Sequence, residues 1–150
     1  MRKLIQSGLA ATTIAVVLSA VALLAHDQRH PCNLGTLRGS YAFNASGFNI
    51  VGGAALPKAI VEVLEFNGDG TLSTSAVTTS VNGTIVRSRP GADGTFTLAD
   101  DCTGTVSFLG GPSFDIAIST KGDRGSMIQT NPNSVFQGTL ARVAREGRDE

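Results

Sequence analysis

The sequence has little of what most enzyme active sites are built from. It holds no tryptophan, one tyrosine, two cysteines and two histidines among 150 residues. It contains no Gly-x-Ser-x-Gly elbow, no phosphate-binding loop and no dinucleotide fingerprint, which removes the motif-based arguments for a serine hydrolase or a nucleotide-dependent enzyme. Neither histidine lies within a strand motif, so a Ser-His-Asp triad has no support.

Charge is scarce as well, and it is balanced. Twelve basic residues face twelve acidic ones, and together they make up 16% of the chain. Without Arg2 and Lys3, which belong to the N-terminal segment, ten basic residues face twelve acidic ones and the net charge is −2. No basic stripe remains, so we expect no nucleic-acid partner. Residues 145–150 alternate in charge sign and predict a flexible, solvated tail.

The N-terminal segment predicts an export signal. Two basic residues precede an apolar run from Leu4 to Ala25 that ends in small residues, which is the pattern of a secretory signal peptide. Ala20-Val21-Ala22 fits the small-x-small rule for cleavage, cleavage after Ala25 is the alternative, and an uncleaved anchor is a third reading because about 20 apolar residues span a bilayer. We expect residues 1–25 to form a cleaved signal helix. The mature protein would then be secreted or periplasmic, with no stable membrane span.

Both cysteines follow this segment. Cys32 lies in a leader of residues 26–35, and Cys102 lies far along the chain. An even cysteine count in an exported chain predicts a disulfide. The alternative is a redox-active or metal-binding pair, which the absence of CxxC spacing disfavours.

Turn signals recur through the rest of the chain. Asn67-Gly68-Asp69-Gly70-Thr71-Leu72 is echoed by Gly91-Ala92-Asp93-Gly94-Thr95-Phe96, and looser copies occur at 101–106 and 81–85. Asn-Gly and Asp-Gly accept positive φ at little cost and favour antiparallel hairpins. Alternation of apolar and polar residues is common, and no sustained 3.6-residue period follows residue 25. We therefore expect about nine strands, at Thr36–Ser46, Ala59–Phe66, Thr71–Val81, Thr84–Arg89, Gly94–Ala99, Gly104–Leu109, Ser113–Thr120, Gly125–Thr130 and Ser134–Val143.

Short strands with short connections predict an all-β fold, an antiparallel up-and-down β-barrel of eight or nine strands at residues 36–144. A sandwich is the alternative, but Greek keys need at least one long connection. Closure also removes the exposed edges of strands rich in threonine and valine. The one long connection that we expect is the apolar, glycine-rich segment Gly47–Pro57. It would cap a mouth of the barrel or pack under one end.

Two segments carry a resemblance to a known type of protein. Gly39-Ser40-Tyr41-Ala42-Phe43 and the stretch Gly94–Thr105 resemble small exported bacterial proteins of the allene-oxide-cyclase and lipocalin type of β-barrel. Lipocalins begin with Gly-x-Trp, and an arginine of the last strand packs over that tryptophan. The resemblance implies that Tyr41, in place of the tryptophan, and Arg142 take these roles. Allene-oxide-cyclase-like barrels include cyclases and isomerases, but no catalytic motif of theirs is found here.

The aromatic residues are candidates for lining the barrel. The apolar lining would come from Phe43, Phe48, Leu64, Phe66, Phe96, Phe108, Phe114 and Phe136. A barrel of this size can also be filled entirely by its own side chains. As residues that contact a small apolar ligand we single out Tyr41, Phe43, Glu62, Leu64, Phe66, Arg87, Phe96 and Phe114.

Glu62 is the residue with the clearest chemical potential. Alternation within Ala59–Phe66 places Glu62 and Glu65 on opposite faces of a strand, which disfavours two-carboxylate glycosidase chemistry. If the face of Glu62 is the barrel interior, its carboxylate needs a partner or its pKa rises. If that face is solvent-exposed, Glu62 forms at most a surface salt bridge of little energetic value.

Three residues are plausible partners for a buried Glu62, namely Arg38, Arg87 and Asp115. A Glu62–Arg87 pair in a cavity would suit acid–base work on a small ligand. Asp115 alternates with Phe114 and Ile116, so it points to the opposite face from them.

The sequence predicts no metal site and no cofactor. His26 and His30 have HxxxH spacing, and His26 would become a copper-chelating N-terminus only if cleavage fell after Ala25. Asn67, Asp69 and Thr71 present alternating oxygens, but no glutamate follows at the offset that a calcium loop needs. Hairpin turns are the favoured interpretation of this segment and of Asp100-Asp101.

Three functions remain open at this point. The first is binding of a small apolar molecule inside the barrel. The second is a cyclase or isomerase that uses a buried Glu62 or Asp115. The third is a surface or extracellular assembly subunit that associates through an unpaired strand edge such as Thr71–Val81. Whether the protein is an enzyme is not decided by these residues.

Overall fold

The computed structural model describes residues 31–88 and 93–144. Every described residue belongs to the unit Pro31–Glu150. The expectations for the signal at residues 1–25, for residues 26–30 of the leader and for the tail at 145–150 lie outside the described residues. Both histidines lie outside them as well.

The described chain is almost entirely β-strand, which confirms the expected fold class. A 3-10 helix, η2 (Leu34–Thr36), precedes nine strands. The strands are β1 (Arg38–Val51), β2 (Ala54–Asn67), β3 (Thr71–Val81), β4 (Thr84–Ser88), β5 (Asp93–Leu98), β6 (Thr103–Phe108), β7 (Ser113–Ile118), β8 (Arg124–Gln129) and β9 (Ser134–Ala144).

Eight of these strands close into an antiparallel barrel, and β4 is an extra strand outside the closure. The strand order is β2-β1-β9-β8-β7-β6-β5-β3-β4, and pairing of β2 with β3 completes the ring. One edge of β3 carries two partners, β5 along Thr71–Ser73 and β4 along Val77–Val81. The other edge of β3 pairs with β2. The idea that Thr71–Val81 is a free edge is therefore wrong.

The segment Gly47–Pro57 is not a loop, which corrects the expected connection. β1 and β2 continue through it and pair residue by residue from Arg38↔Asn67 to Val51↔Ala54, with a two-residue turn at Gly52-Gly53. Glycine is needed at position 47 because the neighbouring strand comes very close. A Cβ atom there would lie 1.9 Å from the Val135 carbonyl oxygen. The glycine that suggested a loop is instead a point where strands bend together.

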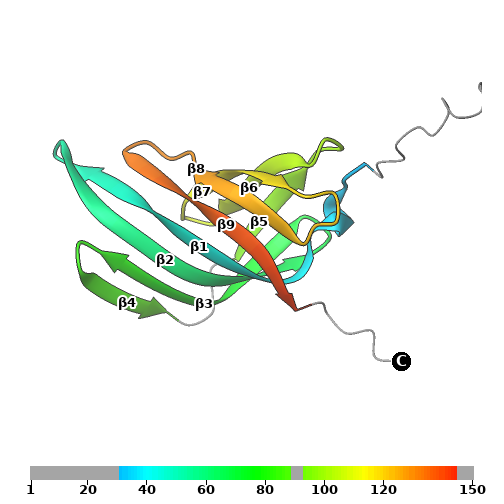
Figure 1. Ribbon diagram of the computed structural model, residues 1–150, viewed down its shortest axis with the longest axis horizontal. Helices are drawn as coiled ribbons and strands as arrows, with labels where there is room; N and C mark the ends of the chain where they lie inside the picture. The colour runs from blue at the N-terminus through cyan, green and yellow to red at the C-terminus, as the bar shows by residue number, and fades with distance from the viewer. Residues whose placement is uncertain (1–30, 89–92, 145–150) are drawn as a thin grey trace, which may run out of the picture. The chain divides into compact units, whose positions relative to one another are not determined.

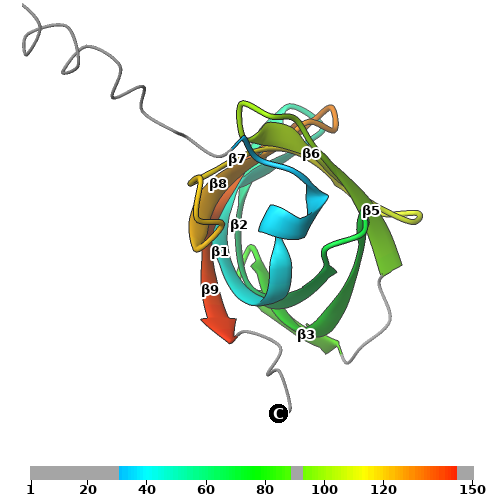
Figure 2. The ribbon, with the colours of Figure 1, turned by 90° about the vertical axis from the view of Figure 1, so that its right-hand side faces the viewer.

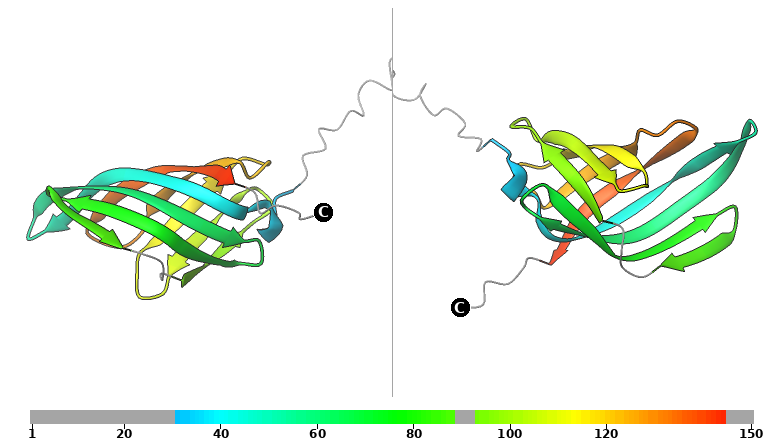
Figure 3. Two further views of the ribbon diagram at one scale, coloured as in Figure 1. Left: turned by 90° about the horizontal axis from the view of Figure 1, so that it is seen from below. Right: turned by 180° about the vertical axis from the view of Figure 1, so that it is seen from behind.

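Unequal strand lengths divide the barrel into two halves. β1 and β2 have 14 residues each and β3 and β9 have 11, whereas β5, β6, β7 and β8 have six each. The eight barrel strands meet at the end near η2, which we call the base. The β1–β2 and β3–β4 hairpins extend past the short strands at the other end, which we call the mouth (Figures 1 and 3). The barrel wall is thus complete at the base and one-sided at the mouth.

The base is closed by the N-terminal segment. η2 lies across this end of the barrel (Figure 2), and Leu37, which follows it, is fully buried. The Arg142 guanidinium lies 5.0 Å from the centre of the Tyr41 ring. Its Nη2 donates hydrogen bonds to the Thr36 carbonyl at 3.1 Å and the Gly122 carbonyl at 2.7 Å, and the Tyr41 hydroxyl donates to the same Gly122 oxygen at 2.5 Å.

A disulfide adds a covalent tie at the same end. Cys32 and Cys102 are bonded, with their Cα atoms 5.1 Å apart and a separation of 70 positions in sequence. The backbone N–H of Cys32 also donates to the Asp100 carbonyl at 3.1 Å. The expected pairing is confirmed, and it holds the leader against the β5–β6 turn.

Aromatic rings fill the complete half of the barrel. Tyr41, Phe66 and Phe96 form a chain of edge-to-face contacts with centroid separations of 5.2 and 5.1 Å. Phe43 and Phe114 make a similar contact at 5.7 Å. Such pairs add about 0.5–1.5 kcal/mol beyond the burial of their area. The described interior near the base is therefore a packed aromatic core.

Removing the disulfide tests how much the base depends on it. In the chain-entropy model a cross-link that closes a 70-residue loop stabilises a protein by roughly 4 kcal/mol. We expect the Cys32→Ser/Cys102→Ser variant to lose about this much free energy of unfolding in urea titrations. An unchanged midpoint and slope would show that the hydrogen bonds of η2 hold the base without help.

Candidate functional site

The structure separates the eight singled-out residues into three groups. Tyr41, Leu64, Phe66 and Phe96 are at most 3% exposed and belong to the core of the base half. Phe43, Phe114 and Glu62 lie higher, where the complete wall ends. Arg87 lies on β4, outside the barrel. Only the middle group is placed to meet a molecule that enters the mouth.

Glu62 lies inside the barrel, on the floor of the mouth. Its direct strand partners are Phe43 on β1, which is 1% exposed, and Val77 on β3. Glu62 itself is 9% exposed, and Thr74 donates a hydrogen bond from its hydroxyl to Glu62 Oε1 at 2.8 Å. The interior placement considered from the sequence is thus the one observed.

Burial perturbs the acidity of Glu62. Loss of water around the carboxylate raises its pKa above the ordinary value for a glutamate, and this is the largest effect. The hydrogen bond from Thr74 and the positive charge of Lys58 act in the opposite direction and are smaller. The carboxyl group is therefore available as a proton donor at a higher pH than a glutamate in water.

Lys58 is a site residue that the sequence did not reveal. Its Nζ lies 4.2 Å from the centre of the Phe136 ring and 3.5 Å from Gln129 Oε1. Gly47 pairs directly with Lys58 on one side and Phe136 on the other. Because Gly47 has no side chain, the lysine reaches across it to the ring.

The surroundings of Lys58 also perturb its acidity. Burial lowers the pKa of the ammonium group, and the negative charge of Glu62 partly raises it again. Gln129 is held in place by its own hydrogen bond, from Nε2 to Asn131 Oδ1 at 3.3 Å. The mouth thus contains one acidic and one basic group that influence each other across an apolar floor.

An apolar surface rises from this floor along the tall side of the wall, and we call it the upper inner face. Strand pairing places its members on the same side as the buried Leu64 and Glu62. Most are partly exposed, and Val86 is 55% exposed. Its residues are Leu56, Ile60, Val77, Thr79, Val81 and Val86. Ile60 packs against the core, and the other members of this face do not belong to the core cluster.

A polar atom at the rim lacks a partner. Ser134 pairs with Asn49 where β9 meets β1, and its hydroxyl is buried. Within the described residues this hydroxyl makes no hydrogen bond. Buried polar atoms in proteins are nearly always satisfied, so this hydroxyl is an exception among the described residues.

The three partners expected for Glu62 are not found beside it. Arg87 pairs with Thr78, one position away from Val77, so it points to the outer face. Asp115 is exposed on the outer face of β7, as its alternation with Phe114 predicted. Arg38 lies at the start of β1, at the base. The supposed Glu62–Arg87 pair and the supposed buried Asp115 are therefore wrong, because alternation cannot tell which face of a strand is inside.

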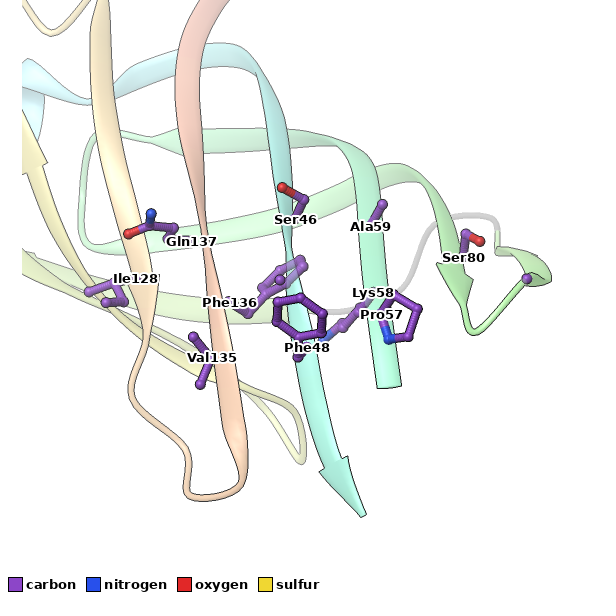
Figure 4. A pocket seen from close by; sticks show the side chains of 12 residues that line it. Ser46, Phe48, Pro57, Lys58, Ala59, Ser80, Ile128, Val135, Phe136 and Gln137 are labelled. Carbon is purple, nitrogen blue, oxygen red and sulfur yellow. The ribbon is translucent and has the colours of Figure 1, made fainter. Parts of the chain in front are cut away.

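Phe48 does not line the barrel interior, which corrects the prediction from the sequence. It is 44% exposed on the outer face, between Val135 of β9 and Pro57 of β2, which are its direct strand partners. These side chains border a shallow hollow of about 630 Å³ on the outside of the barrel, next to Ile128 and Ala59 (Figure 4). The hollow is mainly apolar, Lys58 and Phe136 contribute to its lining as well as to the mouth, and its described lining includes no acidic side chain.

The turn residues considered as metal ligands have a structural role. Asp69 Oδ1 accepts hydrogen bonds from the N–H and hydroxyl of Thr71 at 2.9 and 2.6 Å. Asp101 Oδ1 does the same for Thr103 at 3.0 and 2.7 Å. These bonds lower the pKa of both carboxyl groups. Across residues 31–88 and 93–144, no three side chains of the metal-ligating types gather in one place.

Comparisons with known proteins do not identify the chain. No protein-family model matches it, no curated protein matches it, and no solved structure matches it. The function of the protein is therefore inferred from the geometry of the site alone. The described residues also contain no helix with the length and apolar character needed to cross a bilayer.

The raised pKa of Glu62 makes a prediction about pH. Below the ordinary glutamate pKa of 4.5, the carboxyl is protonated in both the folded and unfolded protein. As the pH rises, the unfolded chain ionises first, so the folded state loses stability until the pH passes the folded-state pKa. We expect the free energy of unfolding of the wild type to fall relative to that of Glu62→Gln over this range and then to level off.

Urea titrations of both proteins at a series of pH values measure this difference. The glutamine keeps an oxygen that accepts the Thr74 hydrogen bond, so the variant removes the charge and little else. A difference that is independent of pH would mean that Glu62 ionises as freely as in water.

Proposed function

We propose that this protein binds a small, mainly apolar molecule in the mouth of its barrel. The observation that carries the proposal is the upper inner face, which rises above a filled core and remains partly exposed. Ligand sites in proteins are typically apolar surfaces with a few polar groups that fix orientation. Here Glu62 lies at the floor, Lys58 lies two rows above it, and the charge of each group acts on the other.

The filled base supports a ligand position at the mouth. The rings of Tyr41, Phe66 and Phe96 pack against one another below the floor. We therefore do not expect them to contact a ligand. Phe43 and Phe114 form the upper layer of that core. A ligand would rest on this layer and lie along the tall wall formed by β1, β2 and β3.

We also propose a relation to lipocalin-type barrels and a location outside the cytosol. Tyr41 with Arg142 stacked over it at 5.0 Å supports a relation to lipocalin-type barrels. The disulfide supports an oxidising location, secreted or periplasmic, because such bonds persist mainly outside the cytosol.

A cyclase or isomerase that acts in the same mouth is the second candidate. It is favoured by the buried carboxyl of Glu62, whose raised pKa suits a general acid. Exchange of Glu62 for glutamine separates the two functions. Ligand binding survives this exchange if the protein only binds, and turnover is lost while binding survives if Glu62 is a catalytic acid.

Two adjacent threonines offer a matched test of the mouth. Thr79 belongs to the upper inner face and pairs with Ile60, whereas Thr78 is exposed on the outer face of the same strand. An indole at position 79 would occupy the space above the floor. We expect N-phenyl-1-naphthylamine, a neutral fluorescent probe, to bind saturably to the wild type. Thr79→Trp should weaken it at least tenfold, and Thr78→Trp should leave its Kd unchanged.

A Phe48→Ser variant serves as the control for the outer hollow, because Phe48 borders that hollow and is not part of the mouth. Loss of probe binding in Phe48→Ser with full binding in Thr79→Trp would move the site to the outside of the barrel. Absence of saturable binding to the wild type would contradict the proposed function.

A further inference from the structure

β4 ends the sheet with an edge that no described strand covers. It is the last strand in the pairing order, and within the part of the chain that the structure describes its only strand partner is β3. All five of its residues are exposed, and Ile85 and Val86 are each 55% exposed. In Figure 1 β4 lies at the periphery, beyond β3.

Natural edges are protected by short length, charged side chains, proline, a bulge or a covering segment. β4 is short and carries Arg87, but its described residues include no proline, no lysine and no bulge. β4 has the sequence Thr-Ile-Val-Arg-Ser and pairs with β3 in an unbroken register from Val81↔Thr84 to Val77↔Ser88. A short strand with two β-branched apolar residues and a free backbone edge is suited to pairing with another strand.

The turn before β4 determines which backbone groups are free. Asn82 and Gly83 both have positive φ, 48° and 84°, as in a two-residue type I′ turn. The residues that flank such a turn form a hydrogen-bonded pair, and bonded and non-bonded pairs alternate from there. Thr84, Val86 and Ser88 thus bond to β3. The N–H and C=O groups of Ile85 and Arg87 point away from β3, toward the open edge.

This pattern is complementary to itself. When two copies of β4 run antiparallel about a twofold axis at Val86, Ile85 of each copy faces Arg87 of the other. All four outward N–H groups then meet outward C=O groups, and Val86 faces Val86 across a non-bonded pair. Arginine faces isoleucine and not arginine, so no like charges are directly opposed. We infer that β4 pairs with β4 of a second copy and joins two barrels into a symmetric dimer.

The side chains agree with this arrangement. Val86 lies on the inner side of the sheet, in the same row as Thr79 and Ile60. Pairing at the twofold axis would bring the two Val86 side chains together and extend the apolar inner surface of each copy toward the other. The dimer uses the backbone edge of β4 and not the floor around Glu62, and Val86 is the residue that it shares with the upper inner face.

Proline at an outward position tests the hydrogen bonds of the edge. Ile85→Pro and Arg87→Pro each remove one outward N–H and no bond to β3. Ile85→Thr is the matched control, because it keeps the N–H and the β-branched shape. By size-exclusion chromatography with light scattering, we expect the wild-type protein to have twice the mass of one chain. Both proline variants should raise the dimer Kd more than tenfold, and Ile85→Thr should remain dimeric.

A single cysteine tests the register. Both native cysteines are in the disulfide, so Val86→Cys adds the one free thiol among the described residues. Under mild oxidation it should give a covalent dimer, since residues in a non-bonded antiparallel pair have Cα atoms about 4.5 Å apart. Thr84→Cys, which would face Ser88 of the other copy, should give none. A monomeric wild type, or a dimer that persists in both proline variants, would overturn the inference.

Discussion

The divided edge of β3 is the constraint on which the rest of the structure depends. β5 pairs with only three residues of that edge, Thr71–Ser73, while β4 occupies Val77–Val81. The first pairing closes the barrel at the base. The second diverts the upper part of β3 away from the short strands, which leaves the mouth one-sided and makes β4 an edge.

Closure at the base is reinforced from several directions at once. Arg142 stacks on Tyr41 and bonds to the carbonyls of Thr36 and Gly122, and the Cys32–Cys102 disulfide lies at the same end. These contacts connect the first strand, the last strand and the N-terminal helix. The three-residue pairing of β3 with β5 is therefore not the only interaction that keeps the barrel closed.

A packed base and a one-sided mouth place the polar groups where they have chemical consequences. Glu62 sits at the level where the short strands end, so it is desolvated by the core below it and still close to the mouth. Lys58 is stacked on Phe136 two rows higher because Gly47 leaves the space. Burial inside the barrel shifts the pKa of both groups, which distinguishes them from ordinary surface charges.

The fold was largely predictable from local signals. Turn residues such as Asn82-Gly83 and the Asp69–Thr71 motif mark hairpins directly, because positive φ and side-chain hydrogen bonds act over a few residues. The same reasoning failed at Gly47–Pro57, where glycine and proline suggested a loop. A close approach of β9 to β1 at Gly47 explains that glycine, and no local pattern contains that information.

The site was predictable only in part. Alternation placed Glu62 on one face with Ile60 and Leu64, and that face is the inner one. Alternation alone did not show which face was inside, so Phe48 was assigned to the interior and Arg87 to the wrong partner. Lys58 was missed because its contacts, Phe136 and Gln129, come from strands far away in the sequence.

Methyl NMR offers the most direct measurement of ligand entry at the mouth. Methyl groups of Ile60, Val77 and Val86 lie on the upper inner face, whereas those of Val61 and Val135 are exposed on the outer face. On titration with N-phenyl-1-naphthylamine we expect the first three to shift and the last two to stay in place. Shifts confined to the outer methyls, or equal shifts on both faces, would contradict a ligand site in the mouth.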